Sequence, residues 1–164
     1  MSEKLLHGIE FSNLESSSYG ALSPFQFHIL KTILPDRKDW DSFLEPELKN
    51  LPSPFLLPDM FESIQVIRRH TQKKSHILLF GDRDTDGISS STHLGVFFRE
   101  LHEKNGGKLT IKTSSANDDY GLCPSAVNFI KAQKPDLLIT LDFGTSNYEE
   151  INFLASLGIE VIVL

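Results

Sequence analysis

The sequence is poor in the features that mark secreted and membrane proteins. It has a single cysteine, Cys123, which excludes an internal disulfide and fits a reducing compartment. No apolar run approaches the ~20 residues that span a bilayer, and the polar start from Met1 to Lys4 does not resemble a secretory signal. We therefore expect a cytoplasmic protein with no membrane partner.

Positive charge is also scarce. The chain has 16 Lys and Arg residues against 22 Asp and Glu residues, which gives a net charge of −6. Nucleic-acid affinity depends mainly on cations placed at phosphates, so this balance argues against a self-sufficient nucleic-acid-binding domain. What the chain has in quantity is apolar: 40% of its 164 residues are hydrophobic, including 12 phenylalanines. That is enough for a proper core, and the length predicts one domain, or one domain with a small appendage.

The pattern of the chain changes near residue 75. Residues 1–75 read as a helical lead-in whose short helices are broken by prolines. The pair Ser23–Pro24 predicts a helix start, with an N-cap followed by proline in the first turn. Asp39 is a second candidate cap. A loop at 51–60 then leads into a helix with one apolar face, made by Met60, Ile64 and Ile67.

Residues 76–164 alternate between strand and helix patterns. Such alternation predicts an α/β fold with a mainly parallel open sheet and helices on both faces. We expect strands at 76–80, 108–113, 136–141 and 159–164, and helices at 88–104, 124–134 and 147–157. The first of these helices carries an apolar stripe of Leu94, Phe97, Phe98 and Leu101.

Carboxylates follow two of the predicted strands. Asp82, Asp84 and Asp86 come directly after the first strand, and Asp142 comes directly after the third. Ligands of open parallel sheets bind outside the carboxyl ends of the strands, so these four side chains are expected to converge there. Clusters of oxygen ligands suit hard cations such as Mg²⁺, Mn²⁺ or Ca²⁺.

Three other interpretations fit part of this acidic stretch. The opening of a calcium EF-hand loop matches Asp82 to Gly87, but the twelfth position is His93 instead of glutamate, and a strand precedes the loop instead of a helix. The nucleophile loop of haloacid-dehalogenase phosphatases usually has threonine where this chain has Ile88. A solvated acidic turn is the third interpretation, with Asp86 or Ser89 as the N-cap of the next helix.

Several motifs together resemble the DHH phosphoesterase superfamily, and within it the RecJ-like exonucleases. They are GDRDTDGISS at 81–90, YGL at 120–122 and LLITLDFGTS at 137–146, followed by a helix with two glutamates and the strand LGIEVIVL. The stretch FLEPELKNLPSPFLLPDM at 43–60 is similar to the segment that precedes this domain in RecJ proteins. The resemblance covers residues 39 to 164.

The resemblance implies metal-dependent hydrolysis of phosphodiesters, most simply of single-stranded DNA in the 5′→3′ direction. By motif, Asp84, Asp86 and Asp142 would be the catalytic metal ligands, and Asp82 would orient a ligand or a bound water. Two ions, Mn²⁺ or Mg²⁺, would be held in the complete site. Residues expected at the substrate are Arg83, Gly87, Tyr120, Gly121 and Gly144.

The chain departs from the family pattern at three positions. Arg83 stands where the family often has tyrosine, and it brings a cation among the aspartates. Phe143 replaces a cysteine. Ser115 stands where the family has an arginine about five residues before the tyrosine of the YGL motif.

The family also has the sequence D-H-H directly after the strand that contains Leu164. We therefore expect this chain to represent the truncated N-terminal part of a DHH phosphoesterase domain, at 76–164, and to be inactive alone. Two alternatives remain open. One is a non-catalytic RecJ-like scaffold in a DNA replication or repair assembly. The other is a DHH phosphodiesterase that acts on short oligonucleotides or cyclic dinucleotides.

Overall fold

The computed structural model of the chain describes residues 22–115 and 119–164. The first 21 residues of the expected lead-in therefore lie outside the described residues. The chain falls into two compact units, residues 1–54 and 55–164. Each unit is described by itself.

The described residues of the first unit form two short α-helices around a small core that contains Phe27 and Trp40. Helix α1 (Pro24–Ile33) starts with a capping box: the Ser23 hydroxyl accepts from the Gln26 amide at 3.3 Å, and the Gln26 side chain accepts from the Ser23 amide at 2.9 Å. This confirms the predicted start at Ser23. Helix α2 (Trp40–Leu44) buries Trp40 against Phe27 and Leu30 of α1.

The predicted cap at Asp39 is wrong. A 3-10 turn, η1 (Arg37–Asp39), runs directly into α2, so Asp39 already has helical backbone angles and its side chain makes no capping bond. Asp36 caps the turn instead, because its carboxylate accepts from the Lys38 amide at 3.2 Å. Two further 3-10 turns follow α2, namely η2 (Leu48–Asn50) and η3 (Pro54–Leu56).

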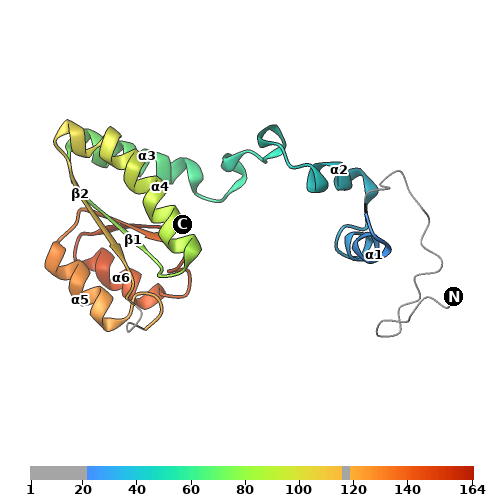
Figure 1. Cartoon of the computed structure of the whole chain (residues 1–164). Helices are drawn as coiled ribbons and strands as arrows, with labels where there is room; N and C mark the ends of the chain where they lie inside the picture. The colour runs from blue at the N-terminus through green and yellow to red at the C-terminus, as the bar shows by residue number, and fades with distance from the viewer. Residues whose placement is uncertain (1–21, 116–118) are drawn as a thin grey trace. The chain divides into compact units, whose positions relative to one another are not determined.

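The second unit is built on a four-stranded parallel sheet (Figure 1). The strands lie in the order β2-β1-β3-β4, and every neighbouring pair is parallel. Their bounds are β1 (His76–Gly81), β2 (Lys108–Thr113), β3 (Leu137–Leu141) and β4 (Glu160–Val163). The helices are α3 (Met60–Lys73), α4 (Thr85–Leu101), α5 (Pro124–Gln133) and α6 (Tyr148–Ser156), with a short 3-10 turn, η4 (Glu103–Asn105), after α4.

Helices cover both faces of this sheet. On one face, Ile77 and Leu79 of β1 pack with Phe98 of α4 and with the apolar side of α3. On the other face, Leu78 and Phe80 pack with α5 and α6. Successive side chains of β1 therefore point to opposite faces of the sheet and pack into two separate cores. The predicted α/β fold, with a parallel sheet between two helical layers, is confirmed.

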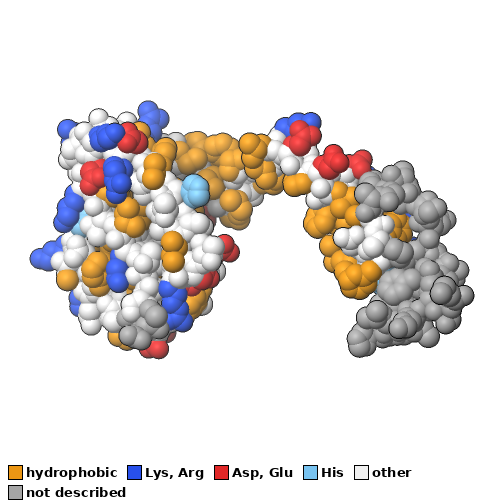
Figure 2. Space-filling model, viewed as in Figure 1, with side chains coloured by type: hydrophobic (Ala, Val, Ile, Leu, Met, Phe, Trp, Pro, Cys, Tyr) orange, Lys and Arg blue, Asp and Glu red, His pale blue; other side chains and the backbone are white. Residues whose placement is uncertain are grey.

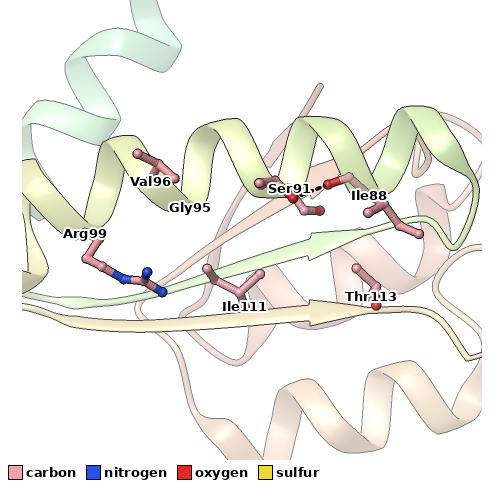
Figure 3. Close-up of a pocket in the computed structure, with 8 residues that line it drawn as sticks. Ile88, Ser91, Gly95, Val96, Arg99, Ile111 and Thr113 are labelled. Carbon is pink, nitrogen blue, oxygen red and sulfur yellow. Dashed lines mark hydrogen bonds between the residues drawn. The ribbon is translucent and has the colours of Figure 1, made fainter.

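Helix α4 differs from its prediction in both its bounds and its packing face. It begins at Thr85, three residues before the expected start, and it meets the sheet largely through small residues. Figure 3 shows Gly95 of α4 above Ile111 of β2; a Cβ added at Gly95 would lie 2.6 Å from the Ile111 side chain. This close approach displaces the expected stripe, so Phe97 and Leu101 are exposed and only Phe98 is fully buried.

Helix α3 contacts the sheet through Val66 and Ile67, whereas Ile64 of the predicted face is exposed. The chain just before α3 and the first turn of α3 carry a group of exposed apolar side chains, which Figure 2 shows as an orange surface, namely Phe55, Leu56, Leu57 and Phe61. Within the described ranges, no helix combines the length and the apolar character needed to cross a membrane.

Candidate active site

The carboxylates lie at the carboxyl edge of the sheet, where the direction of chain winding reverses. Strand β1 has β2 on one side and β3 on the other, so the connections after β1 and after β2 lead to opposite sides of β1. Such a reversal opens a crevice between the two central strands, and this is where open α/β sheets bind their ligands. The loop 82–84 follows β1, and Asp142 follows β3, at this point.

Asp82 is turned inward and fixes the loop that follows β1. Its residue is only 6% exposed, and its amide donates to the Leu141 carbonyl at the end of β3 at 3.1 Å. Its carboxylate accepts from the Arg83 amide at 2.7 Å. Asp82 thus ties the ends of β1 and β3 together, whereas Asp84 and Asp86 are exposed.

Asp84 is the N-cap of α4, a position that the sequence analysis gave to Asp86 or Ser89. Its carboxylate accepts from the Gly87 amide at 2.9 Å, and Asp86 lies in the first turn of the helix. Both carboxylates are therefore favoured by the partial positive charge at the helix start. Gly87 is needed for close approach, because a Cβ there would lie 2.5 Å from the Asp82 carbonyl oxygen.

Asp142 is held in an unusual backbone conformation directly after β3. Its φ is 65°, in the left-handed region that non-glycine residues seldom adopt. Its amide donates to the Leu164 carbonyl at 2.9 Å, so the end of β4 fixes this turn. Residual backbone strain of this kind occurs often at functional sites.

The carboxylates converge closely enough to perturb one another. The pKa of the Asp142 carboxyl is raised, first by partial desolvation at the rim, then by the negative charges of Asp84 and Asp86. The charge of Asp82 and a hydrogen bond with the Asp84 side chain act in the same direction. Within the described part of the chain, negative charge therefore dominates the surroundings of Asp142.

This cluster has the right donor chemistry for a hard cation but not a closed ligand shell. Among the described residues, no set of three or more His, Cys, Asp or Glu side chains is arranged to hold a metal ion. Asp84 and Asp142, which share a hydrogen bond, are the pair closest to a bridging arrangement. A bound divalent cation would offset the repulsion between these carboxylates.

Arg83 bridges the loops after β1 and β2. Its guanidinium donates to the Ser115 carbonyl at 3.4 Å, while its own amide is held by Asp82. The cation is thus held on the β2 side of the crevice. Ser115, where the family has an arginine, contributes its backbone oxygen to this contact.

Tyr120 and two glycines lie on the β3 side. The Tyr120 hydroxyl donates to the Asp142 carbonyl at 3.3 Å. Gly121 and Gly144 both have positive φ, of 78° and 115°. A Cβ at Gly144 would lie 2.8 Å from the buried Thr140 hydroxyl, so this glycine is required by packing as well.

Sequence analysis missed the residue that anchors this second loop. The Asn147 side chain accepts from the Leu122 amide at 3.1 Å and packs against Gly121, which joins the YGL motif to the start of α6. The only available signal was its place at the start of the helix predicted at 147–157. Between the two loops is an open cavity of about 480 Å³, lined by Tyr120, residues 142–146 and Leu164.

Comparisons with known proteins agree with this fold. Residues 76–164, more than half of the chain, match the family described as DHH family, N-terminal domain. This chain belongs to the DHH family. The match begins at the first residue of β1 and runs through the whole sheet.

Individual relatives are single-stranded-DNA-specific exonucleases named RecJ. The protein of Escherichia coli (strain K12) is 28% identical over 120 residues, which are 73% of this chain and 20% of that protein. The protein of Bacillus subtilis (strain 168) is 26% identical over 121 residues, 74% of this chain and 15% of that protein. The chain therefore spans about a fifth or less of the length of these curated relatives.

Solved RecJ structures share the fold. A crystal structure of exonuclease RecJ bound to manganese superposes with a TM-score of 0.55 and 26% identity, over 69% of this chain and 27% of that one. RecJ of Thermus thermophilus, in complex with Mn²⁺, gives a TM-score of 0.53 and 24% identity, over 76% of this chain and 17% of that one. The second likeness concerns the fold alone.

Proposed function

We propose that this chain is part of a divalent-metal-dependent phosphodiesterase, a RecJ-like exonuclease that degrades single-stranded DNA from its 5′ end. The observation that carries the proposal is the meeting of acidic loops from β1 and β3 at the switch point of a DHH-family sheet. The relatives are exonucleases of this specificity, and the RecJ structure that is 26% identical to this chain is bound to manganese. A cytoplasmic location belongs to the same proposal.

The metal ligands in this proposal are Asp84, Asp86 and Asp142. The buried Asp82 orients the loop on which two of them stand, through its bond to the Arg83 amide. Mn²⁺ or Mg²⁺ would be the ion, with two ions in a site completed by further ligands. When bound, such ions would activate a water and stabilise the negative charge that develops on the phosphate.

The residues of the chain itself prepare this site. Asp84 and Asp142 must both be ionised to bind a cation, so a proton on the Asp142 carboxyl competes with the ion. The raised pKa of Asp142 means that metal binding weakens as the pH falls toward that value. Because no three-ligand set is closed among the described residues, we expect weak metal binding and no hydrolysis by this chain alone.

Substrate contacts are assigned on both sides of the carboxylates. Arg83, on the β2 side, is suited to a phosphate oxygen. Tyr120, Gly121 and Gly144 form the β3 side. Gly87 contributes less directly, since its amide already donates to Asp84 and its role is to let α4 start close to the sheet.

The test is Mn²⁺ titration followed by NMR, because paramagnetic Mn²⁺ broadens signals near its binding site. We expect selective broadening of the amides of Asp84, Asp86 and Asp142, reduced in Asp142→Asn and displaced by excess Mg²⁺. Glu160→Gln, which changes a carboxylate at the other end of the sheet, is the control and should leave the pattern unchanged. Uniform broadening, or none at the rim, would contradict the proposed site and the function built on it.

A further inference from the structure

Tyr120 combines exposure with rigid placement. The residue is 62% exposed, yet its hydroxyl is held by the Asp142 carbonyl at 3.3 Å. Its ring meets the ring of Phe143 edge-on, with centroids 6.5 Å apart. An exposed aromatic side chain that is fixed at two points is preorganised to receive a flat partner, since little side-chain entropy is lost on binding.

This placement is supported from the core outward. Phe143 is 5% exposed and packs edge-on against Phe80 at 5.5 Å, and Phe80 in turn meets Phe129 at 6.3 Å. A chain of four rings thus runs from β1 and α5 to the rim. The backbone after Tyr120 is fixed as well, because Gly121 packs against the Asn147 side chain.

The cavity beside Tyr120 suits a nucleoside. Its volume of about 480 Å³ falls in the range of small-molecule sites. Its walls combine the aromatic ring with the hydroxyl side chains of Thr145 and Ser146, and Asp142 of the carboxylate cluster forms part of the same wall. A base lying on Tyr120 would therefore belong to a nucleotide whose phosphate lies at the acidic cluster.

We infer that Tyr120 and this cavity form a nucleobase-stacking site, which holds one base of a single strand on the β3 side of the carboxylates. The inference rests on the proposed function for the identity of the ligand as a nucleotide. Stacking on an aromatic ring accepts every base, because each has a π face, and it requires an unpaired base. The site would thus select for single strands without selecting a sequence.

The experiment uses NMR of the intact chain labelled with ¹³C-tyrosine. The chain has three tyrosines, Tyr19, Tyr120 and Tyr148, whose signals are assigned by Tyr→Phe substitution. Titration with dAMP, and separately with dTMP, should move the ring signals of Tyr120 upfield in a saturable way. Deoxyribose 5-phosphate, which lacks a base, should leave them in place, and the ring of Tyr148, also exposed, should not respond to any of the three.

A second measurement uses a short single strand containing 2-aminopurine, whose fluorescence falls on stacking. Tyr120→Leu should weaken binding about fivefold or more, in line with the loss of one base–aromatic stack. Tyr120→Phe should stay within about twofold of the unsubstituted chain, because it keeps the ring. Tyr148→Leu is the matched control and should have no effect.

The outcomes separate this inference from the proposed function. Selective Mn²⁺ broadening at the rim without a base-dependent shift of Tyr120 overturns the stacking site alone. A base-dependent shift without Mn²⁺ broadening supports the stacking site and contradicts the metal-dependent function. Equal shifts of Tyr120 and Tyr148, or equal shifts with the base-free sugar phosphate, overturn the inference.

Discussion

Charged side chains are arranged differently at the two ends of the parallel sheet. At the amino end, Glu160 accepts from the Arg69 guanidinium at 2.6 Å, and the ring Nε2 of His70 lies 2.7 Å away. The Arg69 hydrogen bond, followed by that of His70, lowers the pKa of Glu160. At the same end, the His76 amide donates a hydrogen bond to the Asp136 carboxylate at 2.7 Å. Charge at this edge holds α3 and the strands together.

At the carboxyl end, charge is crowded instead of paired. The pKa of Asp142 is raised by desolvation and by three neighbouring carboxylates, and its backbone is in the left-handed region. An arrangement that disfavours its own ionised form does not stabilise the fold. The comparison separates carboxylates that serve structure from carboxylates kept for binding a cation, and the substitutions below test that separation.

The largest effect is expected at Gly87, where the start of α4 packs directly against the backbone of Asp82. Gly87→Ala would place a Cβ 2.5 to 2.7 Å from three backbone atoms of Asp82, none of which can move without opening the loop. Overpacking of this kind costs about 1–3 kcal/mol, and we expect the upper end of that range. Urea denaturation of both chains without metal measures this loss in the free energy of unfolding.

Gly95→Ala is the matched control on the same helix. Its Cβ would meet the tip of the Ile111 side chain, which can rotate, and alanine favours a helix by about 1 kcal/mol over glycine. The variant should therefore lie within about 1 kcal/mol of the unsubstituted chain. If Gly87→Ala and Gly95→Ala lose equal stability, the close contact between Gly87 and the Asp82 backbone has no special importance for the loop after β1.

The next effect concerns the double role of Asp84. Asp84→Ala should cost about 1 kcal/mol through loss of the bond to the Gly87 amide, whereas Asp84→Asn keeps a capping oxygen and should be nearly neutral. Both variants should lose the selective Mn²⁺ broadening. Thermal unfolding without metal separates the two roles, and a strongly destabilised Asp84→Asn would show that the charge itself supports the fold.

A smaller loss is expected at the amino edge. The Arg69 and Glu160 side chains are 43% and 46% exposed, so Glu160→Gln should cost only about 0.5–1 kcal/mol. Because the folded pKa of Glu160 is below its ordinary 4.5, its contribution is present above pH 4.5 and disappears as the pH falls through the lowered value. At acid pH, and in high salt, the Glu160→Gln variant and the unsubstituted chain should therefore have the same stability. A difference that persists at low pH would assign the loss to packing.

Much of this architecture could be predicted from local sequence. Each strand is a short run of apolar or β-branched residues, so its position followed from composition, and parallel strands bring residues that follow them to one edge. That argument was enough to gather Asp84, Asp86 and Asp142. The start of α4 was placed too late because the acidic stretch 82–86 was interpreted as a loop, although Asp84 is itself the cap.

What failed depends on contacts between distant segments. The packing face of α4 includes Ser91 and Gly95 beside Phe98, and small residues give no signal in an apolar pattern. The clamp between Arg69 and Glu160 joins positions 91 residues apart, which no local rule can pair. The left-handed turn at Asp142 is fixed by the Leu164 carbonyl of the neighbouring strand, so its backbone conformation is likewise a tertiary property.

The smallest change in stability, with the opposite sign, is expected for Asp142→Asn. The substitution removes the crowded charge, and asparagine accepts the left-handed conformation at least as well as aspartate. Since the folded pKa of Asp142 is raised, the fold loses stability as the pH rises from the ordinary 3.8 through the raised value. The variant lacks this loss, so its advantage in Tm should grow across that interval and stay constant above it.

Adding Mn²⁺ should reverse the order of the two chains, because an ion that binds only the folded state stabilises it. The unsubstituted chain should gain in Tm with increasing Mn²⁺, while Asp142→Asn should gain little. Asp142→Ala removes the same charge but puts alanine in the left-handed region, so without metal it should be less stable than the asparagine variant. Thermal melts from about pH 3 to about pH 8, with and without Mn²⁺, measure all three chains. If Asp142→Asn is less stable at neutral pH without metal, Asp142 serves the fold as Glu160 does, and the contrast between the two edges fails.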